Sequence, residues 1–480
     1  ILGQQVQGLL LLMLKIVKSP ATIHGQSAWH FYPKAHTVLQ YNKNWDVEEW
    51  GDNALAEDPR IFKLHLAGIS DDEKPYLPQG LDYRKAITDF LKKMLILIEE
   101  TLTKRWDGIK MSQVRYVFTG TRKIGIFLNC IYDTKIIEKN YNLEFTTERE
   151  TLSIGLPLIP TEAAALHCME TLNEYDLSIG DSYLMVDCGG GTVDLTMRTL
   201  LENKVLDEVT ERSGALCGGV CVDQNFIKFL GEKIGEDAIM NFKQNDYGEY
   251  QYLINNFFCP KIKFGFTGEP SEARKRIILD LNRECPGLKK YANDCVRIPI
   301  NFEDIISMFD PVVEQIINLI EKQLADTTKK CAAMFLVGGF SESIYLTKKI
   351  KDRFRMKVPC INVPHNPITS VMRGAVIYGL NKNVIKNRIL PMSYGMSICD
   401  YKTGRSDKFY CIASRGQKIA LEETFTEICM PENDDQEDVI FEVFATSRTN
   451  VEYCNEDGVK KVGDLRIELP DNHLGSSESE

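Results

Sequence analysis

Three consecutive glycines between two apolar segments dominate this sequence. The stretch from Tyr183 to Met197 reads Tyr-Leu-Met-Val-Asp-Cys-Gly-Gly-Gly-Thr-Val-Asp-Leu-Thr-Met. Its first apolar run predicts a buried strand, and the alternation that begins at Val193 predicts a second strand. A glycine run costs chain entropy, so it indicates a backbone that adopts left-handed angles or approaches a ligand closely.

The chemistry of this turn favours phosphate. Successive backbone N–H groups in a glycine-rich turn form a concave anion site. Asp187, at the end of the first strand, suits a hydrated Mg²⁺, which prefers carboxylate and water ligands beside phosphates. A tight hairpin with surplus glycine is the alternative, but Asp-x-Gly-Gly-Gly-Thr-x-Asp is longer than a hairpin needs. We therefore predict a phosphate-binding hairpin.

Two more glycine pairs occupy comparable positions. Gly218-Gly219 precede a predicted helix over Asp223–Gly231, and Gly338-Gly339 follow a buried strand and precede a helix over Ile344–Phe354. A helix N-terminus offers free N–H groups to an anion. One such pair is weak evidence, but three glycine sites at strand ends or helix starts indicate a nucleotide held in a cleft.

Composition excludes several classes of protein. The chain has 480 residues, enough for two or three domains. Its net charge of −11 argues against a nucleic-acid partner. The apolar run Leu9–Leu14 is too short to span a bilayer, so no membrane association is expected. The 14 cysteines are scattered without a CxxC pair, which predicts reduced thiols and a cytoplasmic location.

The spacing of apolar residues changes along the chain. Helical spacing predicts helices over Leu81–Trp106, Glu162–Leu172, Asn301–Ala325 and Thr369–Leu380. Alternating runs after residue 392 predict strands over Lys408–Ala413, Val439–Ala445 and Val462–Leu469. The chain therefore combines an α/β part with a later β-rich part, and its last residues are predicted to be a disordered tail.

Here the motifs carry a family resemblance. Asp187–Asp194 resembles the second phosphate loop of the actin and heat-shock-70 ATPase superfamily, and Cys217–Asp223 resembles the Leu-Gly-Gly-x-x-x-Asp segment of DnaK-type chaperones. Phe335–Ser343 resembles their adenosine loop. Its Phe-Ser-Glu-Ser ending is similar to the divergent twelfth-type heat-shock-70 branch. The order and spacing fit over residues 37–470, apart from 120–150.

The resemblance implies a fold and its cofactors. It implies a two-lobed actin-like (ribonuclease H-like) ATPase domain, with lobe I over residues 1–180 and lobe II over 181–385, followed by the start of a β-rich peptide-binding-like domain over 386–480. ATP and Mg²⁺ would occupy the cleft between the lobes.

The resemblance also implies roles for individual residues. Asp187 would help to hold the metal-bound water and, with Thr192, would take part in catalysis. Gly218 and Gly219 would close on the phosphates, and Lys263 would reach the adenosine. The other nucleotide-binding residues would be Gly189, Gly190, Gly191, Thr192 and Asp194 at the phosphates, and Gly338, Gly339 and Phe340 along the nucleoside.

The sequence departs from the family pattern in several places. The first phosphate loop, Asp-x-Gly-Thr-Thr, should precede Thr37 and is absent; the first acidic residue is Asp46. The Glu-Pro-x-Ala-Ala-Ala element appears as Pro-Thr-Glu-Ala-Ala-Ala, with Glu162 two residues late. Glu342 replaces an arginine of the adenosine loop. Two explanations stay open: a degenerate relative that binds nucleotide poorly, or an imperfect gene prediction affecting residues 1–35 and 120–150.

Two functions follow from this pattern. The first is an ATP-binding, heat-shock-70-like chaperone-type protein, with nucleotide-dependent control of an adjacent β-rich peptide-binding region. Its partners would be ATP or ADP, unfolded or extended peptides, and co-chaperones. The second is a non-catalytic pseudo-ATPase that acts as a protein-interaction module, so ATP hydrolysis stays undecided. An actin-like filament protein or a sugar kinase fits less well, because neither needs a β-rich segment after residue 392.

Overall fold

The computed structural model describes most of the chain after residue 158 and parts of the first third. The described residues are 38–51, 54, 65, 77–110, 115–116, 142–143, 159–170, 177–274, 276–293, 295–381, 383–400, 403–421, 423–427 and 436–469. Three regions of the sequence analysis lie outside the described residues. They are the predicted tail, the segment before Thr37 where a first phosphate loop was expected, and most of residues 120–150.

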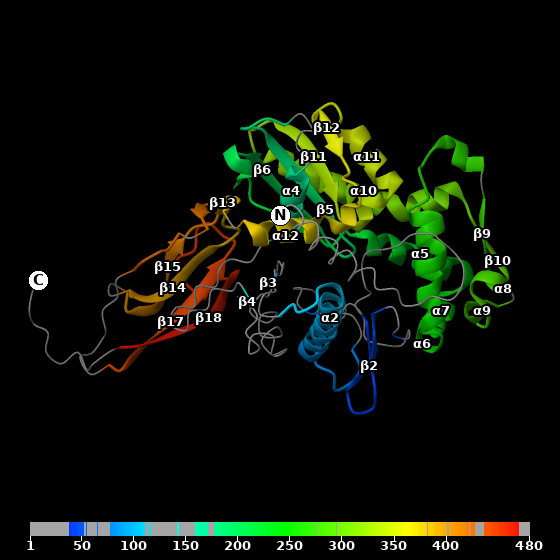
Figure 1. The fold of residues 1–480 in the computed structure, drawn as a ribbon, viewed down its shortest axis with the longest axis horizontal. Helices are drawn as coiled ribbons and strands as arrows, with labels where there is room; N and C mark the ends of the chain where they lie inside the picture. The colour runs from blue at the N-terminus through cyan, green and yellow to red at the C-terminus, as the bar shows by residue number, and fades with distance from the viewer. Residues whose placement is uncertain are drawn as a thin grey trace, which may run out of the picture.

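A mixed sheet of eight strands forms the centre of the molecule (Figure 1). Its order is β12-β11-β5-β6-β7-β13-β16, with β8 paired to β6. β5 and β6 are antiparallel, whereas β11 runs parallel to β5 and β13 runs parallel to β7. The strands are β5 (Ser182–Cys188), β6 (Val193–Leu200), β7 (Leu206–Glu208), β8 (Ser213–Ala215), β11 (Cys331–Val337), β12 (Cys360–Asn362), β13 (Ile385–Ile389) and β16 (Lys418–Ala420).

Helices bury both faces of this sheet. On β5, Leu184 and Val186 pack against α5, α10 and α11, whereas Tyr183 and Met185 pack against α4. Because side chains alternate along a strand, a sheet covered on both sides needs a continuous apolar run, which β5 has. The helices are α4 (Pro160–Met169), α5 (Gly219–Ile234), α10 (Phe302–Ala325), α11 (Ile344–Phe354) and α12 (Ser370–Leu380).

Helices α4 and α12 pack unusually close to one another. A Cβ placed on Gly374 of α12 would lie 1.5 Å from the carbonyl oxygen of Ala163 on α4. Ala163 and Ala375 are buried in the same contact. Only glycine fits at this crossing, so Gly374 sets how closely the two helices approach.

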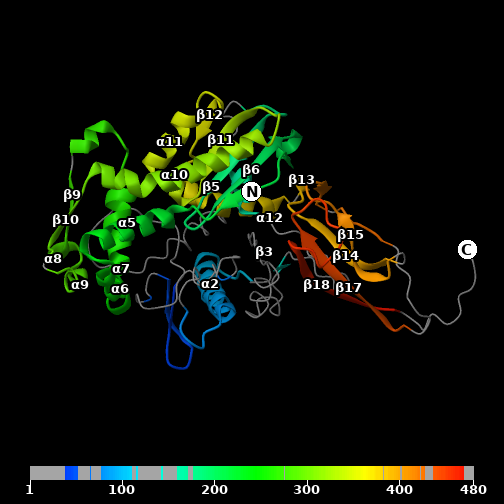
Figure 2. The same cartoon turned by 180° about the vertical axis from the view of Figure 1, so that it is seen from behind.

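A group of short elements lies beyond α5, on the side away from the β-rich part (Figures 1 and 2). Its largest element is the π-helix η7, which contains Pro260 and ends at Lys263. π-Helical turns are rare and occur often at functional sites. The elements are α6 (Glu236–Asn245), α7 (Tyr247–Tyr252), η7 (Leu253–Lys263), η8 (Pro270–Arg274), β9 (Ile277–Asp280), α8 (Leu281–Glu284), α9 (Pro286–Lys289) and β10 (Arg297–Ile300).

A four-stranded antiparallel sheet, drawn in orange to red in Figure 1, forms the β-rich part. Its order is β15-β14-β17-β18, and Phe409, Phe444 and Cys454 form a small core on one face. The strands are β14 (Ser393–Asp400), β15 (Arg405–Ala413), β17 (Asp438–Thr446) and β18 (Val459–Glu468). Strand β16, which lies between β15 and β17 in sequence, pairs with β13 and so joins this part to the large sheet.

Ion pairs reinforce this junction between the two sheets. The Arg415 guanidinium contacts the Glu211 carboxylate at 3.0 Å, and Lys418 Nζ lies 2.6 Å from Asp207. Both pairs are partly exposed, so each contributes little by itself. They supplement the strand pairing of β13 with β16.

The described residues of the first third form a small separate core. Tyr41, Trp50 and Phe90 surround the buried residues Leu39 and Ile87. The elements are β1 (Leu39–Tyr41), β2 (Val47–Trp50), α2 (Tyr83–Arg105), β3 (Arg115–Tyr116) and β4 (Asn142–Leu143). The remaining short turns are η6 (Glu202–Lys204), η9 (Gly339–Glu342) and η10 (Pro367–Thr369).

The α/β class with a later β-rich region is confirmed. The helix predicted over Asp223–Gly231 begins earlier, at Gly219, because Gly218 serves as its N-cap, and it ends later, at Ile234. The helix predicted over Asn301–Ala325 continues through Pro311. Strand β14 was not predicted from the sequence pattern. Among the described residues, each helix is too short or too polar to cross a lipid bilayer.

We expect Gly374→Ala to lower the free energy of unfolding by about 3 kcal/mol, because the new methyl group must push α12 away from the Ala163 carbonyl. Chemical denaturation followed by circular dichroism measures this loss. Leu380→Ala, at the exposed end of the same helix, should change stability by less than about 0.5 kcal/mol. Equal losses in both variants would show that the helix crossing is not tight.

Candidate functional site

The glycine hairpin between β5 and β6 carries a short series of backbone donors. Asp187 lies opposite Asp194 in the ladder, and the Gly189 N–H closes the turn by donating to the Thr192 carbonyl at 2.9 Å. The N–H groups of Gly190, Gly191 and Thr192 donate to no other described backbone or side chain. Successive N–H groups of this kind form a concave anion site, and phosphate fits the donor set.

The first turn of α5 holds the hairpin in shape. Three hairpin carbonyls accept hydrogen bonds from this turn: Gly189 from Gly219 at 3.0 Å, Gly190 from Val220 at 2.8 Å, and Gly191 from Gly218 at 3.3 Å. A Cβ on Gly218 would lie 2.4 Å from the Gly190 carbonyl oxygen, so glycine is required for this approach. The N–H groups at the start of α5 therefore bind the hairpin, and the hairpin itself offers donors to a ligand.

Two carboxylates flank the hairpin on one face of the sheet. Asp187 and Asp194 are directly opposite in the antiparallel ladder, so their side chains lie on the same side. Thr192 Oγ1 donates to Asp194 Oδ2 at 2.9 Å. Gly338, with φ of +83°, passes so close that a Cβ there would lie 2.4 Å from Asp187 Oδ1. Two carboxylates beside free N–H donors suit a hydrated Mg²⁺ next to phosphate.

Lys263 lies next to the start of α5, close to Gly219. Its Nζ contacts both carboxylate oxygens of Asp223, at 2.7 and 2.8 Å. Burial raises the pKa of the Asp223 carboxyl, and the ammonium group of Lys263 partly offsets this rise. A Cβ on Gly219 would lie 3.2 Å from Lys263 Nζ and 3.1 Å from Phe340 Cγ. Lys263 therefore meets α5 and the Phe340 turn at one place.

The structure brings the predicted site residues together. The hairpin contacts α5 through Gly218 and Gly219, α5 contacts Lys263 and Phe340, and Gly338 contacts Asp187. Gly339 lies against Ile368 and faces η10. The partner of Lys263, Asp223, was not predicted as a site residue. It ends the Cys217–Asp223 motif, which was the only local signal for it.

No group of three or more His, Cys, Asp or Glu side chains among the described residues is placed to hold a metal directly. The hairpin itself supplies two carboxylates, those of Asp187 and Asp194. Mg²⁺ is bound in this way beside phosphates, through one or two carboxylates.

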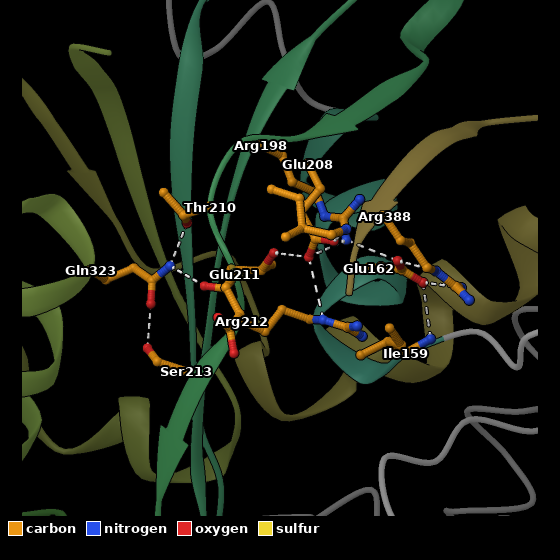
Figure 3. A network of polar contacts seen from close by, with 12 residues as sticks. Ile159, Glu162, Arg198, Glu208, Thr210, Glu211, Arg212, Ser213, Gln323 and Arg388 are labelled. Atoms are coloured by element: carbon orange, nitrogen blue, oxygen red, sulfur yellow. Dashed lines mark hydrogen bonds and ion pairs between the residues drawn. The ribbon is translucent and has the colours of Figure 1, made fainter. Parts of the chain in front are cut away.

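A second polar cluster is buried on the α4 side of the sheet (Figure 3). Glu162 accepts two hydrogen bonds from Arg388, at 2.9 and 2.7 Å, and one from Arg198 at 2.8 Å. Glu162 and Arg198 have no exposed surface, and Arg388 is 3% exposed. Glu162 also accepts the Ile159 N–H at the start of α4, at 3.1 Å. The glutamate that is late relative to the family pattern thus anchors α4 to two strands.

Glu208 extends this cluster along the sheet. Its carboxylate lies 3.4 Å from Arg198 Nη2 and accepts the Ile389 N–H at 2.6 Å. Glu208 is fully buried at the end of β7, beside Arg388 of β13. Two glutamates and two arginines therefore connect α4, β6, β7 and β13.

The ionisation of Glu162 depends on these neighbours. Burial by itself would raise the pKa of its carboxyl. The guanidinium groups of Arg198 and Arg388 and the hydrogen bonds to the carboxylate outweigh burial, so the pKa lies below the usual value of 4.5. The carboxylate form is therefore the one that the fold stabilises.

Comparison with known proteins supports this description. Heat shock 70 kDa protein 12A of Mus musculus is 28% identical over 330 residues, which covers 61% of this chain and 48% of that protein. Heat shock 70 kDa protein 12B of Homo sapiens is 27% identical, with the same coverage of each chain. Chaperone protein DnaK of Anaplasma marginale is 23% identical over 251 residues, 48% of this chain and 37% of that protein. No family model matches the chain.

The large sheet, its glycine hairpin and the separate antiparallel sheet define an actin-like ATPase fold followed by a β-rich region. Within this class the chain is similar to divergent members of the heat-shock-70 superfamily. It spans about half the length of the curated relatives that it matches.

We expect Glu162→Ala to lower the free energy of unfolding by about 3–5 kcal/mol, because it removes the buried carboxylate that both Arg198 and Arg388 contact in the interior. Glu170→Ala, at the exposed end of α4, should cost less than about 0.5 kcal/mol. Urea denaturation of both variants measures the difference.

The effect of Glu162→Ala should also depend on pH. A lowered pKa in the fold means that the contribution is complete above the unfolded value near 4.5 and is lost as the pH falls through the folded pKa. The stability gap between wild type and variant should therefore narrow in acid. A gap that widens below pH 4.5 would contradict an ionised Glu162.

Proposed function

We propose that this chain binds ATP with Mg²⁺ in the manner of a heat-shock-70-like protein. The observation that carries the proposal is the hairpin at Gly189–Thr192, whose N–H groups at residues 190–192 donate to no described group and adjoin Asp187 and Asp194 in the chain. Phosphate needs donors, and its metal ion needs oxygen ligands; this hairpin offers both within a few residues.

Each residue has a distinct part in this proposal. The N–H groups of Gly190, Gly191 and Thr192 would bind phosphate oxygens, and Asp187 would orient water ligands of the metal. Bound Mg²⁺ would neutralise charge on the phosphates. Lys263 would add a positive charge at the cleft wall, with Asp223 fixing its position. Phe340 would offer its ring and the adjoining backbone to the nucleoside.

We extend the proposal to control of the β-rich region. Strand β13 lies in the sheet that carries the hairpin, pairs with β16, and is followed along the chain by β14. Nucleotide shifts an arrangement only if it binds one arrangement more tightly than another. The strand junction would transmit such a shift from the hairpin sheet to the four-stranded sheet, where an extended peptide would bind. Co-chaperone partners and a cytoplasmic location stay predictions.

A second function is favoured by one specific observation. The 45 residues before Asp46 contain no Asp or Glu, so the carboxylate of a first phosphate loop is not found there. Removing one preorganised group typically lowers an enzymatic rate about a hundredfold or more. The alternative is therefore a non-catalytic pseudo-ATPase in which this fold serves as a protein-interaction module.

Isothermal titration of the purified chain with MgATP tests the first proposal. We expect binding that requires Mg²⁺ and that Asp187→Asn weakens about tenfold or more, because the variant loses the charge beside the metal. Asp237→Asn, on the exposed first turn of α6, should bind as the wild type does. Single-turnover release of phosphate then separates the two functions.

Each outcome supports one of the two functions. Binding with turnover supports the ATPase. Binding without turnover supports the pseudo-ATPase, and so does a cleft with no measurable affinity. Equal affinity of wild type and Asp187→Asn would contradict the proposed metal side of the hairpin.

A further inference from the structure

The far end of the four-stranded sheet is a ribbon of only two strands. Strand β14 pairs with β17 from Ser393 to Met396, and Met396 is opposite Val443. Beyond that point, Asp438–Glu442 of β17 pairs only with Asp464–Glu468 of β18 among the described residues. These two segments are referred to below as the distal ribbon. In Figures 1 and 2 the red end of the sheet points away from the large sheet. A two-stranded ribbon is marginally stable in water.

The distal ribbon exposes large apolar side chains on both faces. Ile440 is 57% exposed on one face, and Leu465 and Ile467 are 53% and 43% exposed on the other. The outer edge of β18 pairs with no described strand, and nearly all of its residues are exposed. An exposed, apolar edge strand is a template for pairing with another strand.

The charges along β18 complement a second copy of β18. In an antiparallel pair related by a two-fold axis at Leu465, Asp464 of each copy lies opposite Arg466 of the other. Registers centred one residue earlier or later place Asp464 opposite Asp464, or Arg466 opposite Arg466. A register centred on Val462 also avoids like charges, but it leaves Ile467 beyond the paired segment.

Gly463 provides a second indication for the register at Leu465. Glycine inside a strand weakens it and often marks a place where another group approaches closely. No atom lies within 4 Å of the position that a Cβ on Gly463 would take. With the axis at Leu465, Ile467 of the second copy lies directly opposite Gly463, so its side chain has room over the glycine.

We propose that the chain forms a homodimer through the outer edges of β18, with Leu465 on the two-fold axis. The pairing turns two distal ribbons into one four-stranded sheet and buries Leu465 and Ile467 of both copies. Within one chain, Asp464 contacts Lys461 at 2.7 Å and Arg466 contacts Asp438. These ion pairs are exposed and contribute little to stability. Replacing them with ion pairs to the second copy therefore loses little free energy. The proposal is independent of nucleotide binding.

Charge reversal tests the interface. Sedimentation of the full 480-residue chain over a concentration range should show a monomer–dimer equilibrium. Asp464→Arg and Arg466→Asp should each raise the dissociation constant at least about tenfold, because both interface pairs become like-charged. An equimolar mixture of the two variants should form a heterodimer with affinity near that of the wild type, since the opposing charges are complementary again.

Cysteine cross-linking tests the register. Opposing residues in an antiparallel pair have Cα atoms about 4.5–5.5 Å apart, within the range of a disulfide. Leu465→Cys should form a covalent dimer under mild oxidation. Val462→Cys lies three residues from the axis and should give no more covalent dimer than the wild type. The wild-type amount measures cross-linking through the chain's own cysteines.

Several results would overturn the proposal. A wild-type chain that stays monomeric at all concentrations would exclude the dimer, as would a mixture of the two charge variants that does not associate. Efficient cross-linking through Val462→Cys would exclude the axis at Leu465. Binding of an unrelated extended peptide to a monomer would assign the edge to a different partner.

Discussion

The enclosed charges of Glu162, Arg198, Glu208 and Arg388 are the constraint on which the large sheet depends. Removing an ion from water into the interior costs several kcal/mol unless its partners are in place. Glu162 accepts hydrogen bonds from three residues, and each comes from a different segment of the chain. Helix α4 and strands β6 and β13 must therefore occupy their positions together, since any one of them out of place leaves an unpaired charge in the core.

The same sheet connects these charges to the candidate nucleotide site. Strand β6 carries Asp194 at its hairpin end and Arg198 further along, under α4. The hairpin is held from its other side by the first turn of α5. The backbone of the hairpin is thus fixed by hydrogen bonds at one end of β6 and by buried ions at the other, which favours a preorganised loop over one that forms on binding.

Local features of the sequence were sufficient to predict the hairpin. Three glycines between apolar strands are a contiguous signal, and so are the glycine pairs at 218–219 and 338–339. The start of α5 was predicted late because glycine is a poor helix former, whereas here the glycines serve close packing. The buried ions gave no such signal. Arg388 stands in Lys-Asn-Arg-Ile, which looks like an exposed polar segment, and its partner is far away in the sequence. The sequence by itself does not show which charged residues will pair with one another in the interior.

That sequence distance has a consequence for synthesis on the ribosome. Glu162 and Arg388 are 226 residues apart. At about 5–20 residues per second, a ribosome takes roughly 10–45 s to add the arginine after the glutamate. During that time Glu162 has Arg198 as a partner but lacks both hydrogen bonds from Arg388, so α4 should dock on the sheet less firmly. The ionic cluster therefore sets a waiting period in which α4 is more open to chaperones and proteases.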